Sequence, residues 1–194
     1  EKGYLSVEVS FNVAGGHSSM PNTKTAITQA AAFTEALSDG LFESEFSAPL
    51  EGFITHLAPE MPWALKSVFA NRFLTEPLLL SLYQKSHTGR ALTNNTAVAT
   101  IMASGIKDNV VPASARVVCN SRILPGTTPD DVLERYTALA AKYGGTVEPY
   151  QNMGSGPTST SSTESAEFLM LGQAVKKLFP DALVSPYLTI GGTD

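Results

Sequence analysis

The chain has 194 residues, 43% hydrophobic and 16% charged, which suits one folded domain and part of another and excludes a disordered chain. A net charge of −5 argues against nucleic acid as a partner, because a phosphate-binding surface needs an excess of basic residues. The single cysteine, Cys119, excludes an intrachain disulfide and a multi-cysteine zinc site. No apolar run reaches the roughly 18 residues that cross a membrane, so we expect a soluble protein without a membrane partner; its compartment stays open.

The first ninety residues predict a strand, a helix and an insertion. Residues 4–12 alternate between apolar and polar side chains, which is typical of a strand with one buried face. After a turn rich in glycine and serine, apolar residues follow helical spacing from residue 23 until Gly40 ends the helix. Four prolines interrupt residues 41–91, so we expect an insertion with two short helices, over 63–74 and 78–84.

Strand and helix signals then repeat. Residues 95–103 and 115–124 are rich in strand-forming side chains and are separated by a turn. Thr128, followed by Pro129 and two aspartates, predicts the start of a second long helix, and a last strand follows over 146–150. The order β-α-insertion-β-β-α-β predicts an α/β, ferredoxin-like domain over residues 1–151. Both helices should cover one sheet face, which leaves the other face or an edge strand for a partner.

The character of the chain changes after residue 151. A polar linker over 154–162 precedes a predicted helix over 164–178 and an apolar, strand-like run over 182–188. We expect residues 152–194 to be a linker and a helix-strand piece of a second domain. Because natural domains seldom end directly after a strand, we also expect the chain to be a piece of a longer protein.

His17 is the most unusual of the three histidines. It follows two glycines and lies between the end of a strand and the start of a helix, where an imidazole can donate a hydrogen bond to a developing oxyanion. A turn histidine with only local hydrogen bonds is the alternative. We assign no role to His56 and His87. The histidines lack the spacing of a metal motif, so we assign no metal ligand to this chain.

Arg122 lies among apolar residues in a predicted strand. Such an arginine either pairs with an acid at the surface or presents its two-pronged guanidinium to a carboxylate. Asn109 lies 13 residues earlier, after a tight turn, and its amide could flank the same spot. From spacing alone, the surface pair is the more common outcome.

Four motifs, in order, resemble those of one zinc hydrolase family. Residues 15–21, Gly-Gly-His-Ser-Ser-Met-Pro, are similar to the Gly-Gly-His-Ser-Ser-x-Pro signature of the family of aminoacylase, carboxypeptidase S, acetylornithine deacetylase and succinyl-diaminopimelate desuccinylase. Residues 109–112 and 122–126 resemble its Asn-x-x-Pro and Arg-x-x-Pro-Gly segments, and residues 191–194 its Gly-Gly-Thr-Asp turn. The apolar insertion is most similar to the carboxypeptidase S and N-acyl amino acid hydrolase branch.

The resemblance implies a function for the whole protein. It would be a metallopeptidase or amidohydrolase that cleaves an amide of an N-acyl amino acid or small peptide through zinc-bound hydroxide, with two zinc ions held outside this chain. The chain itself would be the inactive lid, which pairs into a homodimer. His17 would stabilise the oxyanion at the neighbouring subunit's metal centre. The resemblance implies that the following residues bind the substrate or line its pocket: Asn109, Arg122, Gly191, Gly192 and Thr193.

Two alternatives stay open. The chain could be a stand-alone ferredoxin-like module that dimerises or binds a small carboxylate, which predicts a gene of about this length. It could also come from a family member that has lost its metal ligands and serves as a scaffold, which predicts a long gene with broken ligand motifs. The sequence specifies neither the acyl group nor the amino acid side chain.

Overall fold

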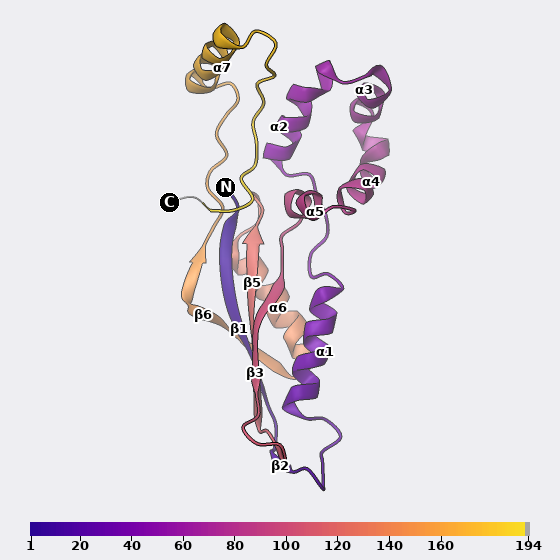
Figure 1. The fold of residues 1–194 in the computed structure, drawn as a ribbon, viewed down its shortest axis with the longest axis vertical. Coiled ribbons are helices and arrows are strands. Elements are labelled where there is room, and N and C mark those ends of the chain that lie inside the picture. Colours follow the sequence, from indigo (N-terminus) through magenta and orange to yellow (C-terminus); the bar gives the residue numbers. More distant parts are fainter. Residues whose placement is uncertain (193–194) are drawn as a thin grey trace.

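A four-stranded antiparallel sheet forms the centre of the computed structural model, which describes residues 1–192 (Figure 1). The sheet order is β3-β5-β1-β6. Its strands are β1 (Gly3–Asn12), β3 (Val98–Ser104), β5 (Ser114–Ile123) and β6 (Gly145–Ser155). Two helices, α1 (Ala26–Ser38) and α6 (Pro129–Lys142), connect them. This order and connectivity confirm the predicted ferredoxin-like arrangement.

The core lies between the sheet and these two helices. Alternate residues of β1 and β5 are buried against α1 and α6 in a single apolar cluster, as the alternation of β1 predicts. The rings of Phe11 on β1 and Phe33 on α1 are 5.7 Å apart. Tyr136 of α6 is fully buried, and its hydroxyl shares a 2.9 Å hydrogen bond with Ser121 of β5. Both helices cover the same face, so the opposite face of β1 and β5 carries neither of them.

The insertion contains more helix than predicted. It consists of α2 (Ala48–Leu57), a short 3-10 turn (Ala58–Glu60), α3 (Trp63–Ala70), α4 (Arg72–Tyr83) and α5 (His87–Thr93). The predicted helix over 63–74 ends early, because Asn71 turns its side chain back onto the Ser67 carbonyl. The predicted start at residue 78 was also wrong, since α4 continues through Pro77. Leu79 of α4 is buried, and this burial offsets the loss of the backbone hydrogen bond that Pro77 removes.

Residues 156–192 form one helix and an extended tail. Helix α7 (Ala166–Leu178) confirms the predicted helix. The predicted strand over 182–188 does not form within the described residues, because a strand needs a ladder partner and this segment meets none. The tail is held differently. Leu188 is buried in a second apolar cluster with Leu124, and the Lys2 amide donates to the Thr189 carbonyl over 3.1 Å.

A small two-stranded ribbon at the far end of the sheet was not predicted. It consists of β2 (Gly16–His17) and β4 (Val110–Val111), which pair antiparallel. In Figure 1 this ribbon lies at the lower end of the sheet, whereas the insertion, α7 and the tail lie at the upper end. Throughout residues 1–192, the helices are too short or too polar to cross a membrane.

Candidate functional site

The ribbon brings His17 and Asn109 together. In the β2–β4 ladder His17 is paired with Val110, the residue that follows Asn109. The Ser18 amide donates to the Asn109 carbonyl over 3.2 Å, which fixes the two loops to each other. Two segments that are about ninety residues apart in the chain therefore present a histidine and an asparagine at one point, which we call the ribbon site.

Local hydrogen bonds orient the His17 ring. The Ser19 amide donates to Nδ1 over 3.2 Å, and the Ser19 hydroxyl lies 2.8 Å from the same nitrogen. A ring nitrogen that accepts from a backbone N–H carries no proton, so the neutral imidazole holds its proton on Nε2. The side chain is exposed. His17 therefore makes the local hydrogen bonds expected of a turn histidine through Nδ1. Its Nε2–H takes no part in them and can donate to another group.

Asn109 carries an unusual unpaired atom. Its side-chain oxygen is shielded from solvent and accepts no hydrogen bond from the residues that the structure describes. A buried polar atom without a partner costs about 1–3 kcal/mol. A hydrogen-bond donor on a ligand or on a second chain would remove this cost.

A second group of residues surrounds Arg122 on the open face of the sheet, and we call it the arginine site. The Arg122 guanidinium carbon lies 5.0 Å from the centre of the Tyr4 ring, its direct neighbour on β1. Two 2.9 Å hydrogen bonds with Thr96 fix the Arg122 backbone. Among residues 1–192 no carboxylate forms an ion pair with this guanidinium. The surface ion pair that the sequence spacing favoured is therefore absent within residues 1–192. The guanidinium can instead bind an external anion.

Lys2 adds a second positive charge near Arg122. Its side chain is buried and donates to the carbonyls of Ala91 and Asn94, at 2.9 and 2.6 Å. Burial, together with the charge of Arg122, lowers the pKa of Lys2 to about 8. Within residues 1–192 no carboxylate forms an ion pair with Lys2 or Arg122, so the two cations favour a negatively charged ligand. Neither Lys2 nor Tyr4 was a predicted site residue. The only signal was that Lys2 directly precedes β1 and that Tyr4 falls on the polar face of this strand.

The tail reaches the arginine site. A side-chain carbon added at Gly192 would lie 3.6 Å from a terminal nitrogen of Arg122, and the backbone of Gly192 therefore passes close beside the guanidinium. Nothing lies within 4 Å of the corresponding position at Gly191. Thr193, the third tail residue in the predicted pocket, lies outside the described residues.

The two sites lie at opposite ends of the sheet. Arg122 pairs with Tyr4 at one end of the β1–β5 ladder, and Ser114 pairs with Asn12 at the other. The eight residue steps from Ser114 to Arg122 along β5 span roughly 26 Å at about 3.3 Å per residue, and the ribbon lies beyond Ser114. Within one chain, Asn109 therefore cannot flank the same spot as Arg122, which corrects that expectation. The 12 residues between them include most of the extended strand β5.

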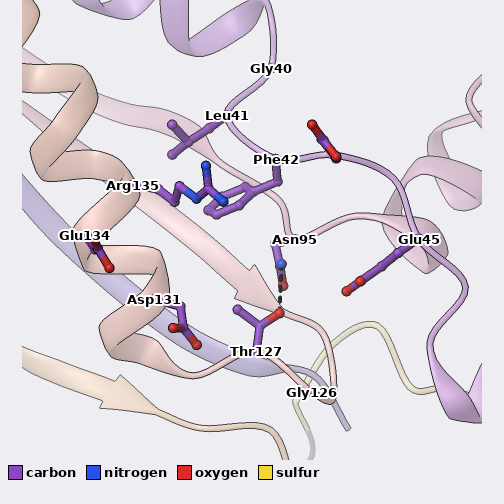
Figure 2. Close-up of a pocket in the computed structure, with 11 residues that line it drawn as sticks. Gly40, Leu41, Phe42, Glu45, Asn95, Gly126, Thr127, Asp131, Glu134 and Arg135 are labelled. Carbon is purple, nitrogen blue, oxygen red and sulfur yellow. Dashed lines mark hydrogen bonds between the residues drawn. The ribbon is translucent and has the colours of Figure 1, made fainter.

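A cavity of about 600 Å³ on the helix side is explained by local structure (Figure 2). Asp131, one of its acids, accepts hydrogen bonds from the amide and hydroxyl of Thr128, which lower the pKa of its carboxyl and cap α6. Asn95 accepts from the Leu124 amide at 2.6 Å and donates to the Thr127 hydroxyl at 3.1 Å. These polar residues of the cavity wall therefore stabilise the turn after Arg122 and the start of α6.

The other two histidines have local partners. His56 lies 2.8 Å from the Gly52 carbonyl through Nδ1 and packs edge-on against Phe168. His87 accepts from Arg90 over 2.7 Å. Over residues 1–192, histidine, cysteine and acidic side chains nowhere gather in a group of three that could hold a metal ion.

The chain matches a known protein family over most of its length. The family described as the peptidase dimerisation domain matches residues 1–148, which is most of the chain. The chain belongs to this peptidase dimerisation domain family. The predicted relationship to the metallopeptidase family of carboxypeptidase S is confirmed, because relatives of this dimerisation domain are named as a carboxypeptidase S-like protein and an N-fatty-acyl-amino acid hydrolase.

Two curated relatives match the dimerisation domain and its tail over the full length of the chain. Human N-fatty-acyl-amino acid synthase/hydrolase PM20D1 is 30% identical over 196 residues. The probable carboxypeptidase S-like 2 of Dictyostelium discoideum is 28% identical over 194 residues. The chain spans 39% of the first protein and 37% of the second. Most of each relative therefore lies outside the region that matches.

A solved structure has the same fold. The M20 family metallo-carboxypeptidase Sso-CP2 of Sulfolobus solfataricus superposes with a TM-score of 0.58 at 19% identity, over 99% of this chain and 53% of that one. At this identity the likeness establishes the fold of the dimerisation domain and its tail. It does not by itself assign roles to side chains.

Proposed function

We propose that this dimerisation domain is the lid of a metal-dependent amide hydrolase that acts on N-acyl amino acids or small peptides. Residues 1–151 would form the lid, and residues 152–194 would return to the catalytic domain. One observation carries the proposal: an oriented N–H donor lies at one end of the sheet, and at the other end lies an arginine that pairs with no carboxylate of residues 1–192. Amide hydrolysis of an N-acyl amino acid needs both, one for the oxyanion and one for the carboxylate.

Pairing of two lids would bring the two ends together. Strand β3 is an edge of the sheet, and three of its apolar side chains, Val98, Ile101 and Met102, are 43–53% exposed. Such an edge can pair with a second copy, and a twofold axis makes identical strands antiparallel. The lower end of one sheet would then lie beside the upper end of its partner. The ribbon site of one subunit would thus approach the arginine site of the other.

Each side chain would then have a defined task. The His17 Nε2–H would donate to the oxyanion of the tetrahedral intermediate, which develops only as the amide is attacked. Arg122, stacked on Tyr4, would bind the substrate's carboxylate, with Lys2 adding to the positive potential. Asn109 would accept a hydrogen bond through its unpaired oxygen. Gly191, Gly192 and Thr193 would line the pocket beside Arg122.

The metal would be bound by the remainder of the protein. The described residues offer no metal site, and we propose that two zinc ions, held outside this chain, supply an activated water. The relatives' names, which include carboxypeptidase and N-fatty-acyl-amino acid hydrolase, support hydrolysis of an amide next to a carboxylate.

Metal removal tests this function. The full-length protein should hydrolyse N-acyl amino acids, lose activity when a chelator removes the metal, and regain it when zinc is restored, because the metal supplies the nucleophile. Residues 1–194 alone should be inactive. Binding of a small carboxylate without turnover by the full-length protein would favour a scaffold, and zinc-dependent turnover by residues 1–194 alone would overturn the assignment as a lid.

A further inference from the structure

Three exposed apolar side chains surround the ribbon site. Ile106 is 99% exposed, Met20 is 78% exposed and Val110 is 42% exposed. Single exposed apolar residues are common and need no explanation. These three are different because each lies within a few residues of His17 or Asn109, on the two loops that the ribbon joins. We call them the apolar tip.

The loops hold the tip in place. Gly105 adopts a φ of +71°, a conformation that favours glycine, and it turns the chain so that Ile106 follows directly. The Val110 amide donates to the Lys107 carbonyl over 3.3 Å, which closes this turn. On the other loop, the Met20 amide donates to the His17 carbonyl over 3.0 Å. The apolar side chains are thus anchored to the same backbone that positions the histidine.

The apolar tip is not part of a hydrophobic core of its own chain. The two apolar clusters of the lid contain none of its members, and Ile106 and Val110 instead line an open cavity of about 690 Å³ beside the ribbon. Full exposure of an isoleucine forgoes the favourable free energy that burial of its side chain would provide. A ligand or a second chain that covers the tip would recover part of this energy.

We infer that the apolar tip contacts the acyl chain of the substrate in the partner's site and sets a preference for long acyl groups. The inference rests on the proposed function. If Arg122 of one subunit binds the carboxylate while His17 of the other reaches the oxyanion, the amide lies between the two subunits. The carboxylate side of the amide then faces Arg122, and the acyl side faces the ribbon. An apolar acyl chain is the part of an N-acyl amino acid that matches Ile106, Met20 and Val110.

The test compares two substrates in the full-length enzyme. The Ile106→Ser variant and wild type are assayed with the N-acetyl and N-dodecanoyl derivatives of one amino acid. The expected result is a loss of about tenfold in kcat/KM for the dodecanoyl substrate and little change for the acetyl substrate, since loss of apolar contact affects only the long chain. Ile27→Ser is the matched control, because Ile27 is 44% exposed on α1, away from the ribbon, and should change neither value.

The possible outcomes distinguish a wrong role for the apolar tip from a wrong proposed function. An equal loss for both substrates, or no loss for either, would overturn the role of the tip. A weaker dimer in light scattering with an unchanged ratio of the two kcat/KM values would also overturn it, because the tip would then contact protein. His17→Ala is assayed in parallel, and full activity of that variant would refute the proposed function itself, whatever the Ile106 variant shows.

Discussion

Replacement of His17 by alanine in the full-length enzyme is expected to lower kcat by about 10²- to 10³-fold, with little change in KM. The reason is that the Nε2–H donor, oriented by the Ser19 amide, would bind the oxyanion only after the amide has been attacked. An interaction made only in the transition state changes kcat rather than substrate binding. Steady-state kinetics with an N-acyl amino acid measure both constants.

A second histidine provides the control for this variant. His87 also accepts a hydrogen bond through Nδ1, but it lies in the insertion, so His87→Ala should retain wild-type kcat. Light scattering should show that the His17→Ala enzyme keeps the oligomeric state of wild type. An unchanged kcat in the His17 variant would remove the histidine from the active site.

Replacement of Arg122 by methionine is expected to lower kcat/KM by about 10²- to 10³-fold, mostly through KM. The guanidinium would hold the carboxylate before and during the reaction, so its loss weakens both states together. Methionine keeps much of the apolar contact with Tyr4 but removes the charge. Substrates with the carboxylate converted to an amide should be hydrolysed equally poorly by the variant and by wild type.

Arg116 is a matched control on the same strand. It lies six residues earlier on the same face of β5 and already pairs with Glu8 over 3.1 Å, so Arg116→Met should leave kcat/KM unchanged. If Arg122→Met and Arg116→Met behaved alike, or if the loss persisted with the amide substrate, a role for Arg122 in binding the carboxylate would be wrong.

Local signals predicted most of the lid. The alternation in residues 4–12 marks β1 because one face is buried by α1 and α6, and Thr128 with Pro129 marks the start of α6 because capping depends on neighbouring residues. Pro77 misled the prediction, because tertiary packing carries α4 through it. The run over 182–188 has strand composition but no partner strand in residues 1–192.

The sequence predicts candidate site residues but not how they are arranged. His17 and Arg122 are candidates because of their context and the motifs that carry the family resemblance, and their roles stay predictions. The ribbon that joins His17 to Asn109 could not, because its strands are two residues long and pair across about ninety residues. The stacking of Arg122 on Tyr4 depends on the register of two distant strands. Spacing alone therefore placed Asn109 beside Arg122, whereas β5 separates them.

In the proposed dimer, each active site combines His17 of one subunit with Arg122 of the other. Subunit complementation tests it most directly. Full-length chains that carry His17→Ala or Arg122→Met are given different affinity tags and coexpressed, and the mixed dimers are isolated. Each homodimer should be nearly inactive. The mixed dimer should recover about half of the wild-type activity, because one of its two composite sites has both residues intact.

The reciprocal pairing provides the control. A dimer of one wild-type chain and one chain that carries both substitutions should be nearly inactive, since each composite site then lacks one residue. If His17 and Arg122 instead acted within one chain, the results would be reversed: the first mixed dimer would be inactive and the second would keep about half of the activity. That reversed result would contradict an active site that combines His17 and Arg122 of different subunits.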